Sequence, residues 1–207
     1  AAPVNPKYLD LLKKYCDPYY SSIPLPYNWK TYGEYLAEVE KYGPMLNTAA
    51  LVGHGSLRVA VTGFDDRKLT PEEMEQMKAL LSDCLEAGAF GLSSGLIYPP
   101  GIFADDEEIL ELAKVVQEHG GMYATHMRSE SEGLVDSVKE TIRVAELTGV
   151  NAEISHHKAA GRKYHGTTKE TLELIRQAFC PNIPQPTACT GQSAVVRAAA
   201  RCAGTAA

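Results

Sequence analysis

The chain has 207 residues, of which 44% are hydrophobic and 22% charged, and its formal net charge is −6 at pH 7. A chain of this length can bury a full core without disulfide staples, and its negative charge argues against a nucleic-acid or anionic-membrane partner. No apolar run reaches the roughly 20 residues of a membrane span, and no signal peptide is visible at the start. The five cysteines are scattered without a Cys-x-x-Cys pair. These features predict a cytoplasmic protein with reduced thiols.

The first 48 residues have the least regular pattern. Residues 8–15 predict a short amphipathic helix, and the proline-containing residues 17–29 predict a loop. Thr31 and Glu34 have the spacing of a capping box, which predicts the start of a second helix. We expect residues 1–48 to form an irregular, partly helical segment that packs on the main domain.

Strands and helices alternate from residue 49 to residue 179. The hydrophobic pattern predicts strands near residues 48–54, 89–95, 121–126 and 152–156, separated by helices that begin at Thr70, Asp105, residue 132 and Thr167 or Thr168. A repeating strand–helix unit is typical of a parallel sheet or barrel with right-handed crossovers. The fold class predicted for this region is therefore α/β.

The last 28 residues, 180–207, differ in composition from the rest of the chain. Their first half is rich in proline, threonine and cysteine, and their end is mostly alanine. They offer no bulky apolar face to bury, so no strand is predicted and we expect a poorly ordered tail.

Two of the predicted strands end in a histidine. His126 follows the apolar run that begins at Gly121, and His156 follows the run that begins at Val150, 156 − 126 = 30 residues later. Neighbouring parallel strands place their carboxyl ends at the same edge, where α/β enzymes keep their chemistry. Because neutral imidazole is the commonest zinc ligand, the repeated placement favours a metal site over two hydrogen-bonded rim histidines.

Four further residues are candidates for substrate contact, each with a structural alternative. His54 follows the first predicted strand in a glycine-flanked turn and is either a ligand or a rim histidine. Arg128 either binds a substrate carboxylate or forms a salt bridge at the rim. Lys158 alternates to the same side as His156, and Tyr98 is either a pocket hydroxyl or a packed loop aromatic.

Other reactive side chains are interpreted as structural. These are His157, which alternates to the opposite side of its strand, the helix-end residue His119, the loop residue His165 and the core residue Cys84.

Four segments together resemble the N-acyl-D-amino-acid deacylases, or D-aminoacylases, of the amidohydrolase superfamily. The segments are Leu-Val-Gly-His-Gly-Ser-Leu-Arg at residues 51–58, Gly-Leu-Ser-Ser-Gly-Leu-Ile-Tyr-Pro-Pro at 91–100, Tyr-Ala-Thr-His-Met-Arg-Ser-Glu at 123–130 and Ile-Ser-His-His-Lys-Ala-Ala-Gly at 154–161. The resemblance implies a metal-bearing TIM-like (β/α) barrel, with residues 49–179 as its central units. It also implies that a zinc-activated water hydrolyses the amide bond of an N-acyl-D-amino acid.

By the same resemblance, His126 and His156 match zinc ligands, whereas Tyr98 and Lys158 match residues that contact the substrate. His54 and Arg128 lie in matching segments, but the resemblance assigns them no definite role.

The chain also departs from the family pattern. It has no His-x-His pair and no cysteine in an Asn-Cys-Gly setting, it lacks the β-sandwich sequence, and no aspartate follows Asp136 to act as general base. We therefore expect a barrel fragment, with residues 180–207 in a different reading, that does not turn over by itself. The alternatives are another amidohydrolase activity, such as cyclic amide hydrolysis, and a catalytically dead fragment that at most binds a metal or a partner.

Overall fold

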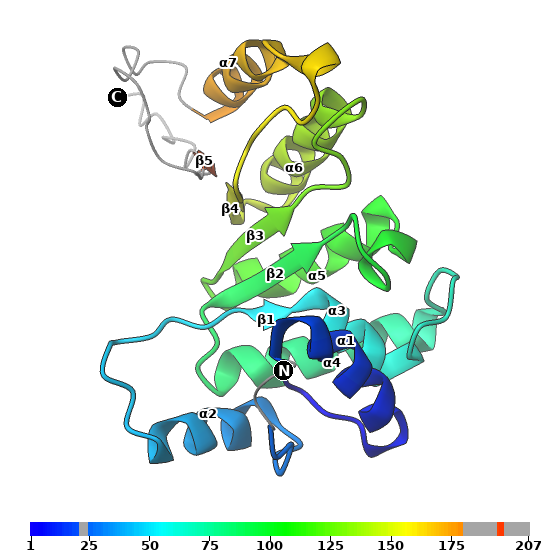
Figure 1. Ribbon diagram of the computed structural model, residues 1–207, viewed down its shortest axis with the longest axis vertical. Helices are drawn as coiled ribbons and strands as arrows, with labels where there is room; N and C mark the ends of the chain where they lie inside the picture. Colours follow the sequence, from blue (N-terminus) through cyan, green and yellow to red (C-terminus); the bar gives the residue numbers. More distant parts are fainter. Residues whose placement is uncertain (21–24, 180–193, 197–207) are drawn as a thin grey trace, which may run out of the picture.

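The computed structural model describes residues 1–20, 25–179 and 194–196. Four strands pair in parallel and in chain order: β1 (Val52–Gly53), β2 (Gly91–Gly95), β3 (Met122–His126) and β4 (Asn151–Ile154). A fifth strand, β5 (Ala194–Val196), pairs antiparallel with β4. Figure 1 shows the strands side by side, with the sequence progressing across the sheet from β1. The α/β class and the parallel strand–helix repeat predicted from the sequence are confirmed.

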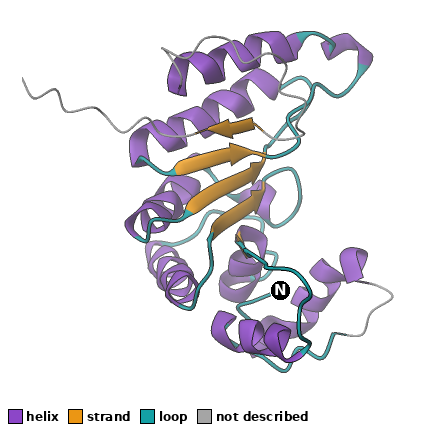
Figure 2. Ribbon diagram, turned by 90° about the vertical axis from the view of Figure 1, so that its left-hand side faces the viewer, coloured by secondary structure: helices purple, strands orange, loops and turns teal. Residues whose placement is uncertain are grey.

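Each parallel strand is followed by helical structure. The helices are α3 (His54–Thr62), α4 (Pro71–Glu86), α5 (Asp106–Glu118), α6 (Leu134–Thr148) and α7 (Thr167–Phe179). Helices α3, α5 and α6 contact the sheet directly, whereas α4 packs beside α3 and α5, and α7 packs beside α6. Figure 2 shows these helices running alongside the layer of strands.

The two faces of the sheet differ in burial. Side chains alternate between the faces of a strand. On one face Leu92, Tyr123 and Ile154 are at most 1% exposed and form part of the core. On the other face Ser93 and Glu153 remain partly exposed. The polar candidates at the ends of the strands therefore border an open surface.

Helix termini follow the capping signals in the sequence. Thr31 caps α2 (Tyr32–Lys41) and Thr70 caps α4, each with a capping box completed by a glutamate three residues later. Asp105 caps α5, and α6 ends at Gly149 in the left-handed conformation. Local hydrogen bonding fixes these ends, so the sequence predicts them well.

The N-terminal segment differs in one respect from its prediction. A short 3-10 helix (Pro6–Tyr8) leads into α1 (Leu9–Tyr20), which continues past Pro18 where the sequence predicts a loop from residue 17. Leu12 and Cys16 of α1 are buried in the core. This burial outweighs the unfavourable propensity of proline near the end of a helix.

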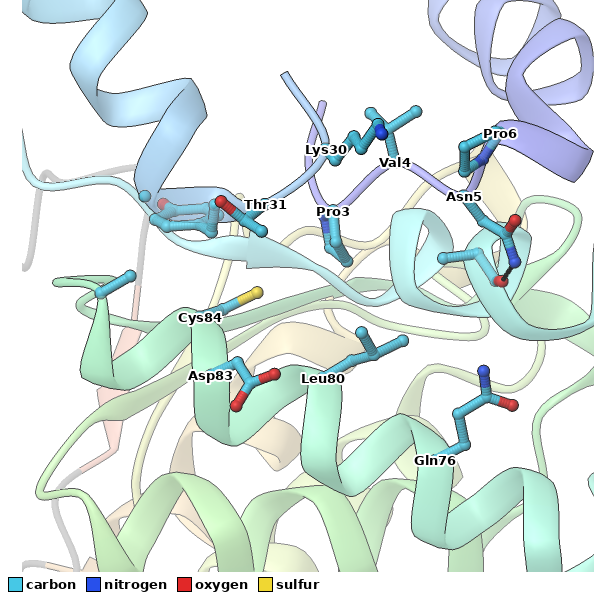
Figure 3. Close-up of a pocket in the computed structure, with 14 residues that line it drawn as sticks. Pro3, Val4, Asn5, Pro6, Lys30, Thr31, Gln76, Leu80, Asp83 and Cys84 are labelled. Atoms are coloured by element: carbon cyan, nitrogen blue, oxygen red, sulfur yellow. Dashed lines mark hydrogen bonds between the residues drawn. The ribbon is translucent and has the colours of Figure 1, made fainter.

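Hydrogen bonds tie the N-terminal residues to one another and to α3. Val4 donates its backbone N–H to the Lys30 carbonyl at 2.7 Å, and Asn5 Nδ2 donates to the Ala60 carbonyl at 2.7 Å. A cavity of about 550 Å³ lies between residues 3–6, the start of α2 and α4, and Figure 3 shows its lining. None of the predicted site residues lines this cavity.

Two expectations about strands are wrong. Residues from His54 onward form the buried helix α3, not a turn after a long strand, and β1 has only two residues. A short apolar run cannot be assigned to strand or helix by periodicity alone. Residues 194–196 form β5 although no strand is predicted after Phe179, because backbone groups at the edge of β4 can pair with almost any sequence. The rest of the tail expectation concerns residues outside the described part of the chain.

Across the described residues, no helix combines the length and apolar character that a membrane crossing would need.

Candidate metal centre

His126 is the last residue of β3 and pairs in register with Gly95, the last residue of β2. The Leu96 N–H donates to the His126 carbonyl at 3.0 Å, which continues the pairing one step past the strand ends. The His126 side chain is 19% exposed. The backbone at this position is therefore fixed by the sheet while the imidazole reaches the open edge.

His156 lies on the turn after β4, two residues beyond Ile154. Its φ is +42°, in the left-handed region that non-glycine residues rarely adopt. The Ser155 N–H still bonds the Thr125 carbonyl at 3.0 Å, so the turn begins directly at the sheet edge. Strain of this kind persists only where the surrounding structure imposes it, and it is frequent at functional sites.

The two imidazoles meet as the sequence predicts. His126 Nδ1 and His156 Nε2 are 2.7 Å apart, and the ring centroids are 4.3 Å apart. The expectation that these histidines lie together at the carboxyl ends of adjacent parallel strands is confirmed. Their role as metal ligands stays a prediction.

Glu130 joins this pair, four residues after His126. Its Oε1 is 2.8 Å from His156 Nδ1 and 3.8 Å from His126 Nε2, and it also accepts from Lys158 Nζ. One ligand atom from each of His126, Glu130 and His156 lies within 4.8 Å of the others. The sequence motif at residues 123–130 contains Glu130, but nothing in the local pattern distinguishes it from a solvent-exposed glutamate.

Electrostatics favour the forms that bind a cation. Burial, and next the neighbouring His156, lower the pKa of His126, which keeps its imidazole neutral. Burial acts to raise the pKa of Glu130, but the ammonium of Lys158 outweighs it and the pKa lies below its usual value. A neutral imidazole and an ionised carboxylate are the states in which these groups coordinate metals.

The donor set fits zinc. Two histidines and one glutamate form a protein shell that leaves a coordination position open, which is typical of catalytic zinc sites. In this structure the donors satisfy one another, and Lys158 also contacts His156 Nδ1 at 3.1 Å. A bound cation would therefore replace the hydrogen bond between the imidazoles and compete with Lys158 for Glu130.

Tyr98 and Lys158 lie beside the group of His126, Glu130 and His156. Tyr98 follows β2 and Lys158 follows β4. The Tyr98 ring centroid lies 5.0 Å from that of His126, and 48% of Tyr98 is exposed. The Lys158 side chain is 50% exposed. Both can meet a small molecule at the open edge, so their predicted contact with substrate remains a prediction that the geometry allows.

Arg128 forms a salt bridge, as its structural alternative predicts. Its Nε donates to both carboxylate oxygens of Glu140 on α6, each at 3.0 Å. Burial raises the pKa of Glu140 although Arg128 opposes the shift. This ion pair links the end of β3 to the helix layer, whereas the buried Nη2 of Arg128 has no hydrogen-bond partner among the described residues. The predicted contact of Arg128 with substrate stays a prediction.

His54 directly follows β1 but is buried instead of open to the sheet edge. It begins α3, has no exposed surface, and its Nε2 lies 2.7 Å from Glu108 Oε1 on α5. Arg58 Nη1 donates to Glu108 Oε2 at 2.7 Å. The imidazole is therefore enclosed by α3, α5 and the loop that carries Gly101, and its predicted role in substrate contact stays a prediction. Glu108 and Arg58 are partners that the sequence analysis does not identify.

The remaining candidates are structural, as predicted. His157 Nε2 is 2.9 Å from Thr171 Oγ1 on α7, on the opposite side from His156. His119 bonds the Val115 carbonyl at the end of α5, His165 lies exposed after the 3-10 helix Arg162–Tyr164, and Cys84 is buried on α4. Cys16 and Cys84 are free thiols.

No family model matches the chain. Among curated proteins, the D-aminoacylase of Alcaligenes xylosoxydans xylosoxydans is 40% identical over 153 residues, which is 74% of this chain and 32% of that protein. The N-acyl-D-aspartate deacylase and the N-acyl-D-glutamate deacylase of the same organism are 36% and 37% identical, over 75% and 70% of this chain and 31% and 30% of theirs.

Solved structures agree with these matches. A crystal structure of D-aminoacylase described as defining a novel subset of amidohydrolases has a TM-score of 0.73 and 39% identity, over 86% of this chain and 36% of the other. The N-acyl-D-glutamate deacylase of Bordetella bronchiseptica, bound to zinc and a phosphonate inhibitor, has a TM-score of 0.74 and 33% identity, over 86% of this chain and 36% of the other.

The chain thus spans about a third of the length of the relatives that it matches, with 32% of the D-aminoacylase and 31% of the N-acyl-D-aspartate deacylase covered. Within that part, sequence identity and fold agree, and the α/β units correspond to part of the amidohydrolase barrel. This chain belongs, over the matched part, to the D-aminoacylase or N-acyl-D-amino-acid deacylase family.

Proposed function

We propose that His126, Glu130 and His156 form the zinc-binding group of an enzyme that hydrolyses the amide bond of N-acyl-D-amino acids. The observation that carries the proposal is the convergence of these three donors, within 4.8 Å of one another, at the carboxyl ends of β3 and β4. The relatives support the reaction class, because their names describe deacylation of D-amino acids and one of them binds zinc.

Each residue has a distinct task in this proposal. Zinc, when bound, lowers the pKa of water and polarises a carbonyl group. His126 and His156 supply neutral imidazole donors, and Glu130 supplies the carboxylate and holds Lys158 beside the group. Lys158 and Tyr98 flank the open edge, where they bind and orient a substrate that carries an amide and a carboxylate.

We expect the 207-residue chain by itself to bind zinc without ordinary turnover. Amide hydrolysis needs a base that removes a proton from water as well as the metal. No aspartate follows Asp136 in the sequence, and Glu130 is already engaged by Lys158 and His156. The cytoplasmic location remains a prediction of the same proposal.

Isothermal titration calorimetry with zinc tests the metal group. The unsubstituted chain and a His165→Ala control, which removes an exposed loop histidine, should bind one zinc ion with equal affinity. His126→Ala should weaken binding at least about tenfold, the equivalent of roughly 1.4 kcal/mol. Tight binding that survives both His126→Ala and His156→Ala would show that other residues hold the metal.

An assay of D-amino-acid release tests the reaction class. The zinc-loaded chain should show no turnover of N-acetyl-D-leucine, N-acetyl-D-aspartate or N-acetyl-D-glutamate. A chimera should supply the rest of the deacylase barrel from a relative while keeping residues 49–179. It should hydrolyse at least one of the three and lose this activity with His126→Ala. A chimera that folds and binds zinc but cleaves only cyclic amides would overturn the proposed substrate.

A further inference from the structure

The loop after β2 connects the proposed zinc group to a buried polar cluster. This loop, residues 95–103, carries Tyr98 and ends in the 3-10 helix Gly101–Phe103. Its outward residues, Ile97, Tyr98 and Ile102, are 38%, 48% and 47% exposed. Its inward residues, Leu96, Pro100 and Gly101, are buried. The buried residues thus anchor the loop to the core, while the Tyr98 ring lies against His126.

The buried cluster consists of His54, Arg58 and Glu108, each at most 1% exposed. Glu108 receives Arg58 Nη1 on Oε2 and meets His54 Nε2 on Oε1, both at 2.7 Å. Arg58 Nη2 donates to the Arg67 carbonyl at 2.8 Å. Because a carboxylate accepts and does not donate, His54 Nε2 carries a proton in this pair.

Nδ1 of His54 faces the loop. It is buried and has no hydrogen-bond partner among the described residues. A Cβ built on Gly101 would lie 3.7 Å from this nitrogen and 2.3 Å from the Gly95 carbonyl oxygen. Helix α3 also contacts the 3-10 helix of the loop directly. A side chain at Gly101 would therefore be in van der Waals contact with the His54 ring, and the Gly95 carbonyl leaves no room for it.

Backbone hydrogen bonds link the position of Gly101 to that of Tyr98. The Ile102 N–H donates to the Tyr98 carbonyl at 2.9 Å, and the Ala104 N–H donates to the Gly101 carbonyl at 3.1 Å. At the other end of the loop, the Leu96 N–H donates to the His126 carbonyl at 3.0 Å. The loop is a closed turn that has His54 on its inner side and His126 at its outer edge.

We infer that His54 is a positioning residue for the candidate site: with Glu108 and Arg58 it forms a fixed base for the 95–103 loop and so sets Tyr98 against His126. The inference uses the proposed function only to identify the group beside Tyr98 as the reacting site. Arg58 neutralises Glu108, and Glu108 fixes the imidazole by its Nε2. The buried ring then determines how closely the loop approaches the end of β3.

Hydrogen exchange on the whole chain tests whether His54 supports the 95–103 loop. In His54→Ala, protection of the Leu96, Ile102 and Ala104 amides should fall at least tenfold more than protection of the Ser155 amide, which bonds Thr125 at the same sheet edge. The control Thr141→Ala removes a buried hydroxyl that bonds Ser137 within α6. It should reduce protection of all four amides by a common factor.

Nuclear magnetic resonance of the His126 ring tests whether His54 sets the position of Tyr98 against His126. General destabilisation of the fold does not change these chemical shifts. Tyr98→Leu defines the ring-proton shifts of His126 without its aromatic neighbour. In His54→Ala the His126 signals should move toward those positions, and in His54→Gln, which keeps a donor for Glu108, they should move less. Gly101→Ala, which displaces the loop by steric overlap, should shift them in the same direction.

Two results would overturn the inference. One is loss of loop protection in His54→Ala by no more than the factor measured at Ser155. The other is a set of His126 signals that move in Gly101→Ala but stay in place in both His54 variants. If His54→Ala does not fold, His54→Gln alone decides the outcome by the same two measurements. Zinc affinity with His126→Ala tests the proposed function separately, so the two failures are distinguishable.

Discussion

Two clusters in this protein use the same chemistry in different surroundings. His54, Glu108 and Arg58 combine an imidazole, a carboxylate and a cation between α3 and α5. His156, Glu130 and Lys158 combine the same three groups at the edge of the sheet, with His126 added. The side chains of the first cluster are at most 2% exposed, whereas the His156 and Lys158 side chains are 40% and 50% exposed.

The difference between the clusters lies in what can reach them. In the buried cluster both carboxylate oxygens have protein donors and water is excluded, so the cluster holds helices and a loop in place. At the sheet edge a carboxylate and two imidazoles face an open surface. The half-exposed ammonium of Lys158 lies beside them and can be displaced by a metal ion. Identical residue types therefore stabilise the fold in one place and form a candidate metal site in the other, because burial decides whether a ligand can enter.

The largest expected effect separates the two glutamates by stability. Glu108→Gln should lower the free energy of unfolding by about 3–5 kcal/mol, because one amide oxygen cannot serve both His54 and Arg58 and a buried guanidinium loses its counter-charge. Glu130→Gln should cost less than about 1 kcal/mol, since its neighbours remain in contact with water. Urea denaturation of both variants measures the difference, and equal losses would contradict the assignment.

Zinc affinity should reverse this order. Glu130→Gln removes an ionised donor and should weaken zinc binding about tenfold or more, whereas a folded Glu108→Gln should bind zinc as the unsubstituted chain does. Calorimetry at a temperature where both variants are folded provides the measurement. A Glu130→Gln variant with unchanged affinity would remove this carboxylate from the metal shell.

A smaller effect is expected at Lys158. Lys158→Met removes an ammonium that pairs with Glu130 and contacts His156, so zinc affinity should rise several-fold as competition and charge repulsion disappear. The matched control is Lys163→Met, since Lys163 lies over the Tyr164 ring instead. Weaker zinc binding in Lys158→Met would indicate that this lysine supports the site in the absence of substrate.

The smallest effect concerns a surface pair next to the buried cluster. Arg67, whose carbonyl binds Arg58, also pairs with Glu73, and Arg67 lowers the pKa of Glu73 to about 2 from its ordinary 4.5. Since the folded pKa is the lower one, this contribution to stability is complete above pH 4.5 and is lost as the pH falls toward 2. Glu73→Gln should flatten the dependence of unfolding free energy on pH in that window. Slopes that match those of the unsubstituted chain would show that the pair is not maintained in solution.

The sequence by itself determines those features that depend on neighbouring residues. Capping boxes at Thr31 and Thr70 mark helix starts because their hydrogen bonds close within four residues. The strand–helix repeat fixes the parallel order of the strands, and that order brings His126 and His156 together at one edge. A residue at the end of a strand has a position that the repeat alone defines.

The tertiary structure decides the rest, since the relevant partners are distant in the chain. Glu108 meets His54 from 54 residues away, and this contact turns an apparent rim histidine into a buried support for the Tyr98 loop. Arg128 bonds Glu140, so its charge is used within the fold. Glu130 becomes a candidate metal ligand because the turn at His156 places that imidazole next to its carboxylate. Burial and long-range pairing set these roles, and a local pattern of residues carries neither.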